Sequence, residues 1–199
     1  NLFITEKKNN SLREIANKFK GQIIEHKDYI GGRYSVMSET GMLPAQLMGL
    51  NVNKFKNLNN LINNQNFIKN LISNVASLSA LINKNIYNSV LLNYDPDMND
   101  FCIWYQQLIA ESLGKKNKGI FPIISTMPRD NHSLLQLYLD GPKVNFFTIF
   151  FSKHANENNI DRNFLPKNFH YLKNKNLEAI LFAQKKSDRK NFYEKKNFI

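Results

Sequence analysis

Short apolar runs alternate with longer stretches of helical periodicity along the chain. The runs are brief and bounded by polar or turn-forming residues, which is typical of buried β-strands. We expect strands at residues 2–5, 22–25, 89–94, 119–125 and 143–151. The apolar run VNFFTIFF at residues 144–151 is far too short to cross a membrane, so it indicates a buried central strand, and the longest one.

The stretches between these runs predict helices, because apolar residues recur there at intervals of three and four. We expect helices at residues 11–19, 38–50, 52–83 (in two pieces, broken near 63–66), 96–114, 133–139 and 174–185. Ser38 and Asp95 are suitable N-caps, and Pro44 should lie in the first turns of its helix or kink it. The polar residues 153–166 indicate a loop.

Strands that alternate with helices imply a parallel sheet covered on both faces. The predicted fold class is therefore α/β, a three-layer α/β/α sandwich. We expect parts of two such domains, the C-terminal part of the first at residues 1–85 and most of the second at 86–199. The chain lacks an initiating Met, and it begins and ends inside expected strands, at 2–5 and 197–199. We therefore expect a fragment of a longer protein.

Composition and charge narrow the function classes. The chain has 199 residues, 42% of them hydrophobic, which supports a substantial core. The single cysteine, Cys102, excludes an internal disulfide and fits a reducing compartment, so we expect a cytoplasmic protein with Cys102 in its core. The net charge of +11 suits nucleic acid, an anionic membrane or a phosphorylated metabolite. Basic residues are dispersed without an RNA-binding motif, so we expect neither nucleic acid nor a membrane as partner, and a nucleic-acid-binding protein is the weakest alternative.

Glu111 is the first candidate for chemistry, in the segment WYQQLIAESLGKKNK at residues 104–118. Trp104, Gln107 and Glu111 share one face of the expected helix, which Gly114 closes. A carboxylate near a helix C-terminus is electrostatically disfavoured as an anion, which suits a general base near neutral pH. By itself, however, a solvent-facing Glu at this place is ordinary, and Gln107 could be a surface amide.

His132 is the second candidate, in the string DNHS 21 residues after Glu111. We expect it at the start of a helix, where the positive end of the dipole favours a neutral imidazole that can accept and return a proton. The alternative is a capping histidine. The remaining histidines, His26, His154 and His170, lie in polar surroundings and are expected to be solvated. The chain shows no HExxH or paired-cysteine pattern, so we expect neither a metal nor a cofactor.

Arg33 is the third candidate, because it follows two glycines that let the backbone turn tightly and approach a ligand. Its guanidinium is permanently charged and can hold an anionic intermediate. A GGR triplet is common, but the longer string GGRYSVMSETGMLP is far more specific.

Three strings together carry a family resemblance: GGRYSVMSETGMLPAQLMG at 31–49, WYQQLIAESLGKKNK, and DNHSLLQLYLDGP. They resemble the phosphoglucose isomerase (glucose-6-phosphate isomerase) family of the sugar-isomerase (SIS) fold, over most of residues 1–199. The resemblance implies an aldose–ketose isomerase of glycolysis and gluconeogenesis. It implies that His132 opens the sugar ring, Glu111 shuttles a proton between C2 and C1 through a cis-enediol(ate), and Arg33 stabilises the enediolate. Gln107 matches a family glutamine that reaches the phosphate or sugar, whereas Asn131 replaces the usual Gln.

The sequence departs from this family in the sugar-phosphate loop. The family usually has a Ser-Lys-Ser-Gly-x-Thr loop, whereas residues 6–11 are EKKNNS. Only Lys7 and Ser11 preserve the side-chain chemistry that binds phosphate. The hydroxyl of Ser11 could cap a helix and also bind a phosphate. Glu6 stands where an anion site disfavours a carboxylate. The loop is therefore either a phosphate site or simply an exposed polar loop.

The resemblance further implies a homodimer in which His132 completes the site of the partner subunit. The family's catalytic lysine lies in a C-terminal E-x-G-K type segment that these residues do not include, so we expect the 199-residue chain alone to be inactive. The main alternative is a non-catalytic sugar-phosphate-binding module of the same fold. The divergent loop favours this module, whereas retention of Glu111, His132 and Arg33 favours an enzyme.

Overall fold

The computed structural model describes residues 1–152, 160, 165–173 and 175–196. The chain divides into two compact units, unit 1 at residues 1–76 and unit 2 at residues 77–199. The boundary between the units falls inside helix α5 (Gln65–Asn83). The assignment of residues 1–85 and 86–199 to two sugar-isomerase domains stays a prediction.

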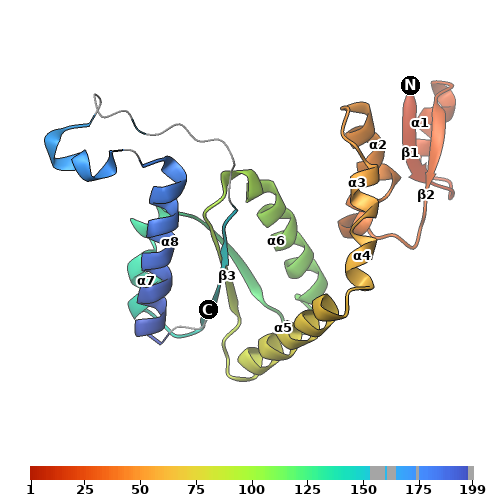
Figure 1. Cartoon of the computed structure of the whole chain (residues 1–199). Coiled ribbons are helices and arrows are strands. Elements are labelled where there is room, and N and C mark those ends of the chain that lie inside the picture. The colour runs from red at the N-terminus through yellow and green to blue at the C-terminus, as the bar shows by residue number, and fades with distance from the viewer. Residues whose placement is uncertain (153–159, 161–164, 174, 197–199) are drawn as a thin grey trace. The chain divides into compact units, whose positions relative to one another are not determined.

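Unit 1 begins with a parallel strand pair and the helix that connects it. Strands β1 (Leu2–Glu6) and β2 (Gln22–His26) pair from Leu2 opposite Gln22 to Glu6 opposite His26. Helix α1 (Ser11–Lys18) joins them, as the pattern predicted. Both strands therefore end at the same edge, and the segments that follow them lie next to each other there (Figure 1).

The rest of unit 1 is helical. A 3-10 helix (Gly32–Met37) leads to α2 (Glu39–Leu47), which Ser38 caps as predicted by accepting a hydrogen bond from Thr40 N, with Pro44 inside the helix. Short helices α3 (Asn53–Lys56) and α4 (Asn59–Ile62) precede α5. The predicted polar break near 63–66 is present, but the segment before it forms two separate turns of helix in place of one continuous helix.

Unit 2 contains a parallel sheet in the order β4-β3-β5. The strands are β3 (Asn88–Asn93), β4 (Phe121–Thr126) and β5 (Asn145–Phe150), with Val90 opposite both Ile123 and Phe147. The three strands are equally long, and β3 is the central one among the described strands. The expectation that residues 143–151 form the longest and central strand is therefore wrong. An apolar run indicates a buried strand but not its place in the sheet, and β3 is also almost entirely buried.

Helices cover both faces of this sheet. Helix α6 (Asn99–Leu113) follows a 3-10 turn (Pro96–Met98). Contrary to expectation, Asp95 caps this turn and not α6 itself, because the N-cap of α6 is Met98. Figure 1 shows α6 on one side of the sheet, and α7 (Leu135–Asp140) and α8 (Leu177–Glu194) on the other. Short 3-10 helices at Arg129–Asn131 and Lys167–Leu172 complete unit 2. The three-layer α/β fold class is confirmed.

Helix α8 is much longer than the predicted segment 174–185. The charged run KKSDRK after Gln184 interrupts the apolar periodicity from which the helix was predicted. The position that faces the core in this run is Asp188, which is polar, and the next such position, one turn later, is Phe192. Both side chains are buried, at 5% and 0% exposure. The strand expected at residues 197–199 and part of the loop expected at 153–166 lie outside the described residues.

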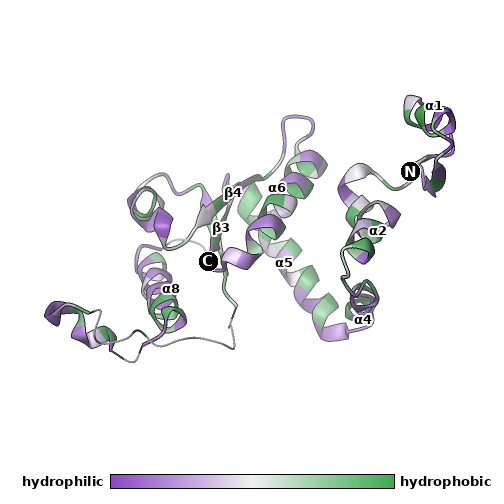
Figure 2. Ribbon diagram, turned by 90° about the horizontal axis from the view of Figure 1, so that it is seen from above, coloured by the Kyte–Doolittle hydropathy of each residue, from purple (hydrophilic) through white to green (hydrophobic). Residues whose placement is uncertain are grey.

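The core of unit 2 fills the space between the sheet and helices α7 and α8. Buried side chains from the sheet, the ends of its strands and these two helices meet there: Val90, Leu92, Tyr94, Met127, Tyr138, Phe147 and Phe192. The opposite face of β3 is equally buried, and Cys102 on α6 is fully buried, as expected. Figure 2 shows hydrophobic and hydrophilic residues on different sides of α6 and α8, the pattern of amphipathic helices. No helix in the described part of the chain has the length and hydrophobicity needed to cross a membrane.

Candidate active site

Arg33 lies in unit 1, in the 3-10 helix that follows β2. Its guanidinium carbon is 5.6 Å from the centre of the Tyr34 ring, within the range of a cation–π contact. The glycines before it do not adopt a left-handed backbone, since Gly31 is extended with φ −64°. A Cβ added at Gly32 would meet nothing within 4 Å. The two glycines therefore leave the approach to this turn open and are not needed to bend it.

A cavity of about 480 Å³ opens beside this turn, where β1 and β2 end. Its walls are polar and apolar in about equal parts and come from both strands, the loop after β1, the segment after β2 and the start of α2: Ile4, Thr5, Glu6, Asn10, His26, Ile30, Gly32, Ser35 and Thr40. In parallel α/β sheets, ligands bind outside the carboxyl ends of the strands. The cavity is therefore the candidate ligand site of unit 1.

His26 lines this cavity and is not solvated, contrary to expectation. Its side chain is only 14% exposed. Nε2 is 3.1 Å from the Ile30 carbonyl oxygen, and Nδ1 is 3.3 Å from both Glu39 Oε1 and Thr40 Oγ1. His26 therefore ties the end of β2 to the start of α2. Among the other histidines expected to be solvated, His170 is exposed, and His154 lies outside the described residues.

Glu39 is the first residue of α2 and the acidic partner of His26. A hydrogen bond from its own backbone N–H, reinforced by the charge of His26 and opposed by burial, holds the pKa of Glu39 below its usual value of 4.5. The positive end of the α2 dipole favours a carboxylate at this position. Glu39 therefore stays ionised at neutral pH and keeps α2 bound to His26.

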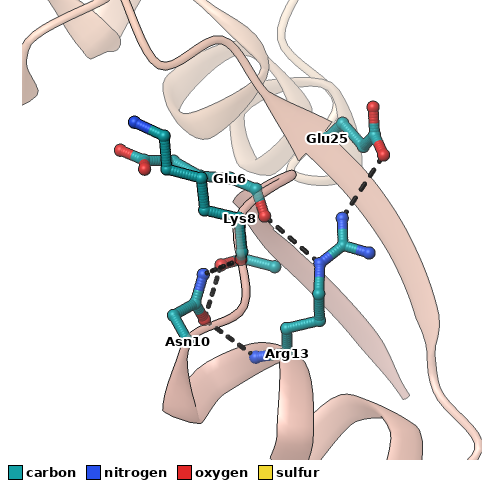
Figure 3. A network of polar contacts seen from close by, with 6 residues as sticks. Glu6, Lys8, Asn10, Arg13 and Glu25 are labelled. Carbon is teal, nitrogen blue, oxygen red and sulfur yellow. Dashed lines mark hydrogen bonds and ion pairs between the residues drawn. The ribbon is translucent and has the colours of Figure 1, made fainter.

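The loop at residues 6–10 is organised by Asn10 and Arg13 (Figure 3). Asn10 Oδ1 accepts from Arg13 N at 2.9 Å and from Thr5 Oγ1 at 3.1 Å, while its Nδ2 donates to the Lys8 carbonyl at 3.0 Å. Arg13 Nε donates to the Glu6 carbonyl, and Arg13 Nη2 pairs with Glu25, each at 3.3 Å. Asn10 is thus the N-cap of α1, and the expectation that Ser11 caps this helix is wrong.

Lys7 and Ser11, the two predicted phosphate-binding residues, are both exposed in unit 1. Ser11 is the first residue of α1, so its backbone lies at the positive end of that helix. Neither residue lines the cavity that contains His26 and Asn10. Their role in phosphate binding stays a prediction.

Gln107 and Glu111 lie together on α6 in unit 2, as the spacing predicted. Gln107 Nε2 donates a hydrogen bond of 3.0 Å to Glu111 Oε1, and both side chains are exposed. This contact orients the carboxylate on the last turn of α6. Gly114 ends the helix, and a Cβ there would come within 2.6 Å of the Ala110 carbonyl oxygen. Glycine is therefore required at this helix end, next to the candidate base.

His132 lies in the segment between β4 and α7, which we call the His132 segment (residues 129–134). Its imidazole is exposed, and its backbone follows the 3-10 turn Arg129–Asn131. Helix α7 begins only at Leu135. The expectation that His132 starts a helix is therefore wrong by a few residues, and a dipole at the start of α7 does not explain proton transfer by this imidazole.

Glu111 and His132 lie at different ends of the sheet of unit 2. Gln106 Nε2 donates to the Pro122 carbonyl at 2.8 Å, which places α6 alongside the beginning of β4. Glu111 is one turn further, beyond that beginning, because α6 runs antiparallel to the strands that it connects. His132 follows Thr126 at the far end of β4, about 13 Å further along the strand than Pro122. Helix α6 covers one face of the sheet and α7, which follows the His132 segment, covers the other, so we infer that one subunit does not bring the two side chains together.

Sequence reasoning missed His26, Asn10, Asp188 and the contact of each with its neighbours. Asn10 had a local signal, since Asn is a favoured N-cap and the apolar periodicity begins just after it. His26 and Asp188 had none, because their partners come from other elements. Glu39 is 13 residues from His26, and Asp188 is 57 residues from Asn131, to which it is hydrogen-bonded.

Comparison with known proteins identifies the family. The phosphoglucose isomerase family model matches residues 8–179. A probable glucose-6-phosphate isomerase of Methanococcus maripaludis is 31% identical over 179 residues, which are 87% of this chain and 40% of that protein. The glucose-6-phosphate isomerase of Mycoplasmopsis pulmonis is 34% identical over 160 residues, which are 77% of this chain and 37% of that protein. The chain thus spans about two fifths of the length of these relatives.

A solved structure shows the same fold. The crystal structure of a hypothetical protein from Thermus thermophilus matches with a TM-score of 0.85 and covers 99% of this chain and 49% of that protein. The two sequences are 21% identical, so this likeness concerns the fold alone. The family model covers most of the chain and includes the positions of Arg33, Glu111 and His132. This chain therefore belongs to the phosphoglucose isomerase family.

Proposed function

We propose that the protein is a cytoplasmic aldose–ketose isomerase that interconverts glucose 6-phosphate and fructose 6-phosphate, as part of glycolysis and gluconeogenesis. The observation that carries the proposal is the family match over residues 8–179, within which Glu111 keeps an exposed, oriented carboxylate. The curated relatives are named glucose-6-phosphate isomerases. No cofactor is required, because the reaction only moves protons within one sugar.

The proposed reaction has two stages, ring opening and isomerisation, and each moves protons through one side chain. His132 takes the proton of the O1 hydroxyl and returns it to the ring oxygen, which opens the ring of glucose 6-phosphate. The Glu111 carboxylate then removes the C2 proton of the open-chain aldehyde, and the electron pair forms a cis-enediol(ate). Glu111 delivers the proton to C1 while the proton of the C2 hydroxyl passes to O1, which gives the ketose, and the guanidinium of Arg33 offsets the negative charge of the intermediate.

The structure of α6 supports Glu111 as the base. Its carboxylate is on the last helical turn, and the Gln107 amide fixes one of its oxygens at 3.0 Å. The same amide lies one turn away on the same face, so it can contact the hydroxyls or the phosphate of a sugar held against Glu111. We assign Gln107 to substrate binding, together with Lys7 and Ser11 for the phosphate.

The position of His132 supports a homodimer. His132 and Glu111 of one subunit belong to segments at different ends of the sheet, because α6 ends near the beginning of β4 and the His132 segment follows its end. A site that uses both side chains therefore needs the His132 segment of a second subunit. A two-fold dimer would contain two such sites, because each subunit would contribute its His132 side chain to the site of the other.

Proton exchange tests the assignment of Glu111. The full-length protein, as the cell makes it, is incubated in D₂O with glucose 6-phosphate, and deuterium at C2 is followed by NMR. We expect exchange in the native protein and a loss on the order of 10³-fold in Glu111→Gln, because an amide cannot accept the C2 proton. Glu194→Gln is the matched control, since it also changes an exposed glutamate at a helix C-terminus. Equal exchange in Glu111→Gln and the native protein would rule out Glu111 as the base.

A non-catalytic sugar-phosphate-binding protein is the second candidate, and the loop at residues 6–10 favours it. The Asn10 side chain already occupies the cap of α1, and Glu6 adds a negative charge to the cavity wall. Calorimetric titration with glucose 6-phosphate distinguishes the two candidates. Saturable binding by the full-length protein, with no exchange at C2, would support the binding protein and contradict the isomerase.

A further inference from the structure

Helix α8 carries a buried carboxylate that the proposed reaction does not use. Asp188 is 5% exposed and lies one turn before Phe192 of the core. Its Oδ2 accepts one hydrogen bond from the Tyr94 hydroxyl and another from Asn131 Nδ2 at 2.8 Å. Tyr94 follows strand β3, and Asn131 belongs to the His132 segment. Asp188 therefore joins three elements that are far apart in the sequence.

Both of these donors to Asp188 are neutral, and their hydrogen bonds help to compensate for its burial. An ionised carboxylate in a protein interior is strongly disfavoured unless such bonds are present, and bonds to an ionised acceptor are stronger than neutral ones. Burial, followed by the hydrogen bond and charge of Asp188, raises the pKa of Tyr94 far above its ordinary value. The phenol therefore keeps its proton and remains a donor at every physiological pH.

The His132 segment is held at two adjacent residues. Asp130 Oδ2 accepts from Thr126 N at 2.8 Å, which fixes the segment to the end of β4. Asn131 Nδ2 fixes it to α8 through Asp188, whereas Asn131 Oδ1 is buried without a hydrogen-bond partner among the described residues. The side chain of the next residue, His132, is exposed, so packing does little to set its position. The backbone of the segment must therefore place the imidazole.

We propose that Asp188 is a positioning residue for His132, which it holds in place through the side chain of Asn131. This inference rests on the proposed function, because it concerns the ring-opening step assigned to His132. Loss of the Asp188–Asn131 bond frees the segment on its α8 side and lets the imidazole move away from the sugar. A displacement of about 1 Å can slow a reaction on the order of 100-fold without removing any catalytic group.

Four variants of the full-length protein separate positioning from stability. Asp188→Ala and Asn131→Ala each remove the bond, whereas Asp188→Asn retains a carbonyl that can accept it. Phe192→Leu is the control for stability, because it loosens the packing of α8 while leaving the bond between Asp188 and Asn131 intact. Hydrogen–deuterium exchange of a peptide that covers residues 129–134 reports order in the segment without any need for activity.

Ring opening is measured separately from isomerisation by NMR exchange between the α and β anomers of glucose 6-phosphate. We expect Asp188→Ala and Asn131→Ala to slow anomer exchange 10- to 100-fold with KM changed by about twofold or less. The double variant should be no slower than either single variant, because both remove the same bond. Asp188→Asn should restore most of the rate, and Phe192→Leu should lower the unfolding midpoint without this selective loss.

Two results would overturn the inference. One is unchanged hydrogen exchange at residues 129–134 in Asp188→Ala, and the other is an equal loss of anomer exchange in Phe192→Leu at matched stability. Failure of the proposed function is a different result. In that case the native protein catalyses neither anomer exchange nor exchange at C2. Amide hydrogens of residues 129–134 would still exchange faster in Asp188→Ala, which would show that Asp188 orders the segment even though the proposed function is wrong.

Discussion

At the scale of single residues, the pair formed by His26 and Glu39 shows how an ordinary sequence position becomes part of a site wall. His26 follows β2 in a polar context, and nothing nearby in the chain marks it. The fold brings it within 3.3 Å of Glu39 and Thr40 and against the Ile30 carbonyl. His26 forms part of the cavity wall, and its contact with Glu39 ties the end of β2 to the start of α2.

The Glu39 carboxylate should stabilise the protein only when it is ionised. Its pKa is lower in the folded state than its usual value of 4.5, so folding favours the charged form. The stabilisation is therefore present above pH 4.5 and is lost as the pH falls through the folded-state pKa. We expect Glu39→Gln to reduce the free energy of unfolding by roughly 0.5 kcal/mol at pH 7, the usual value for an acid in the first turn of a helix.

Denaturant unfolding of both proteins at pH 7 and at pH 3 checks this expectation. The difference between native protein and Glu39→Gln should shrink toward zero at pH 3. A difference that grows at pH 3 would mean that the folded state favours the protonated acid, contrary to the contacts with the backbone and His26.

At the scale of elements, the start of α1 depends on Asn10. Its side chain accepts from Arg13 N and also binds Thr5 and Lys8, whereas Ser11 already lies inside the helix. We expect Asn10→Ala to cost about 1 kcal/mol of stability and to speed hydrogen exchange in α1, because a helix N–H loses its partner. Ser11→Ala is the neighbouring control and should cost far less. A larger loss in Ser11→Ala would restore serine as the cap.

The order of strands and helices could be predicted from the sequence, and the contacts between them could not. Apolar runs marked all five strands, Ser38 marked the start of α2, and Asp95 marked the 3-10 turn before α6, because these signals are local. The end of α8 was missed, since Asp188 is polar in sequence but buried against Tyr94 and Asn131. The motif residues Arg33, Glu111 and His132 were found by resemblance. Where these residues lie relative to the sheet could not be predicted, because it depends on the order and direction of the strands.

At the scale of the whole molecule, the topology of the sheet in unit 2 is the reason for proposing a site that two subunits share. Parallel strands begin at one edge and end at the other, so the last turn of α6 and the segment after β4 point to different edges. Glu111 therefore lies near the edge where the strands begin, and His132 lies near the edge where they end. The same topology leaves each side chain exposed, which makes it available to a second subunit.

Mixing of two inactive variants tests this account most directly. Full-length Glu111→Gln and His132→Ala proteins are unfolded together, refolded as a mixture, and assayed for conversion of glucose 6-phosphate to fructose 6-phosphate. Each variant alone has two damaged sites per dimer. A mixed dimer has one site in which the intact Glu111 of one subunit meets the intact His132 of the other. We expect random mixing to restore about a quarter of native activity, because half of the dimers are mixed and each has one intact site. Activity that stays at the level of the separate variants would contradict a site shared between subunits.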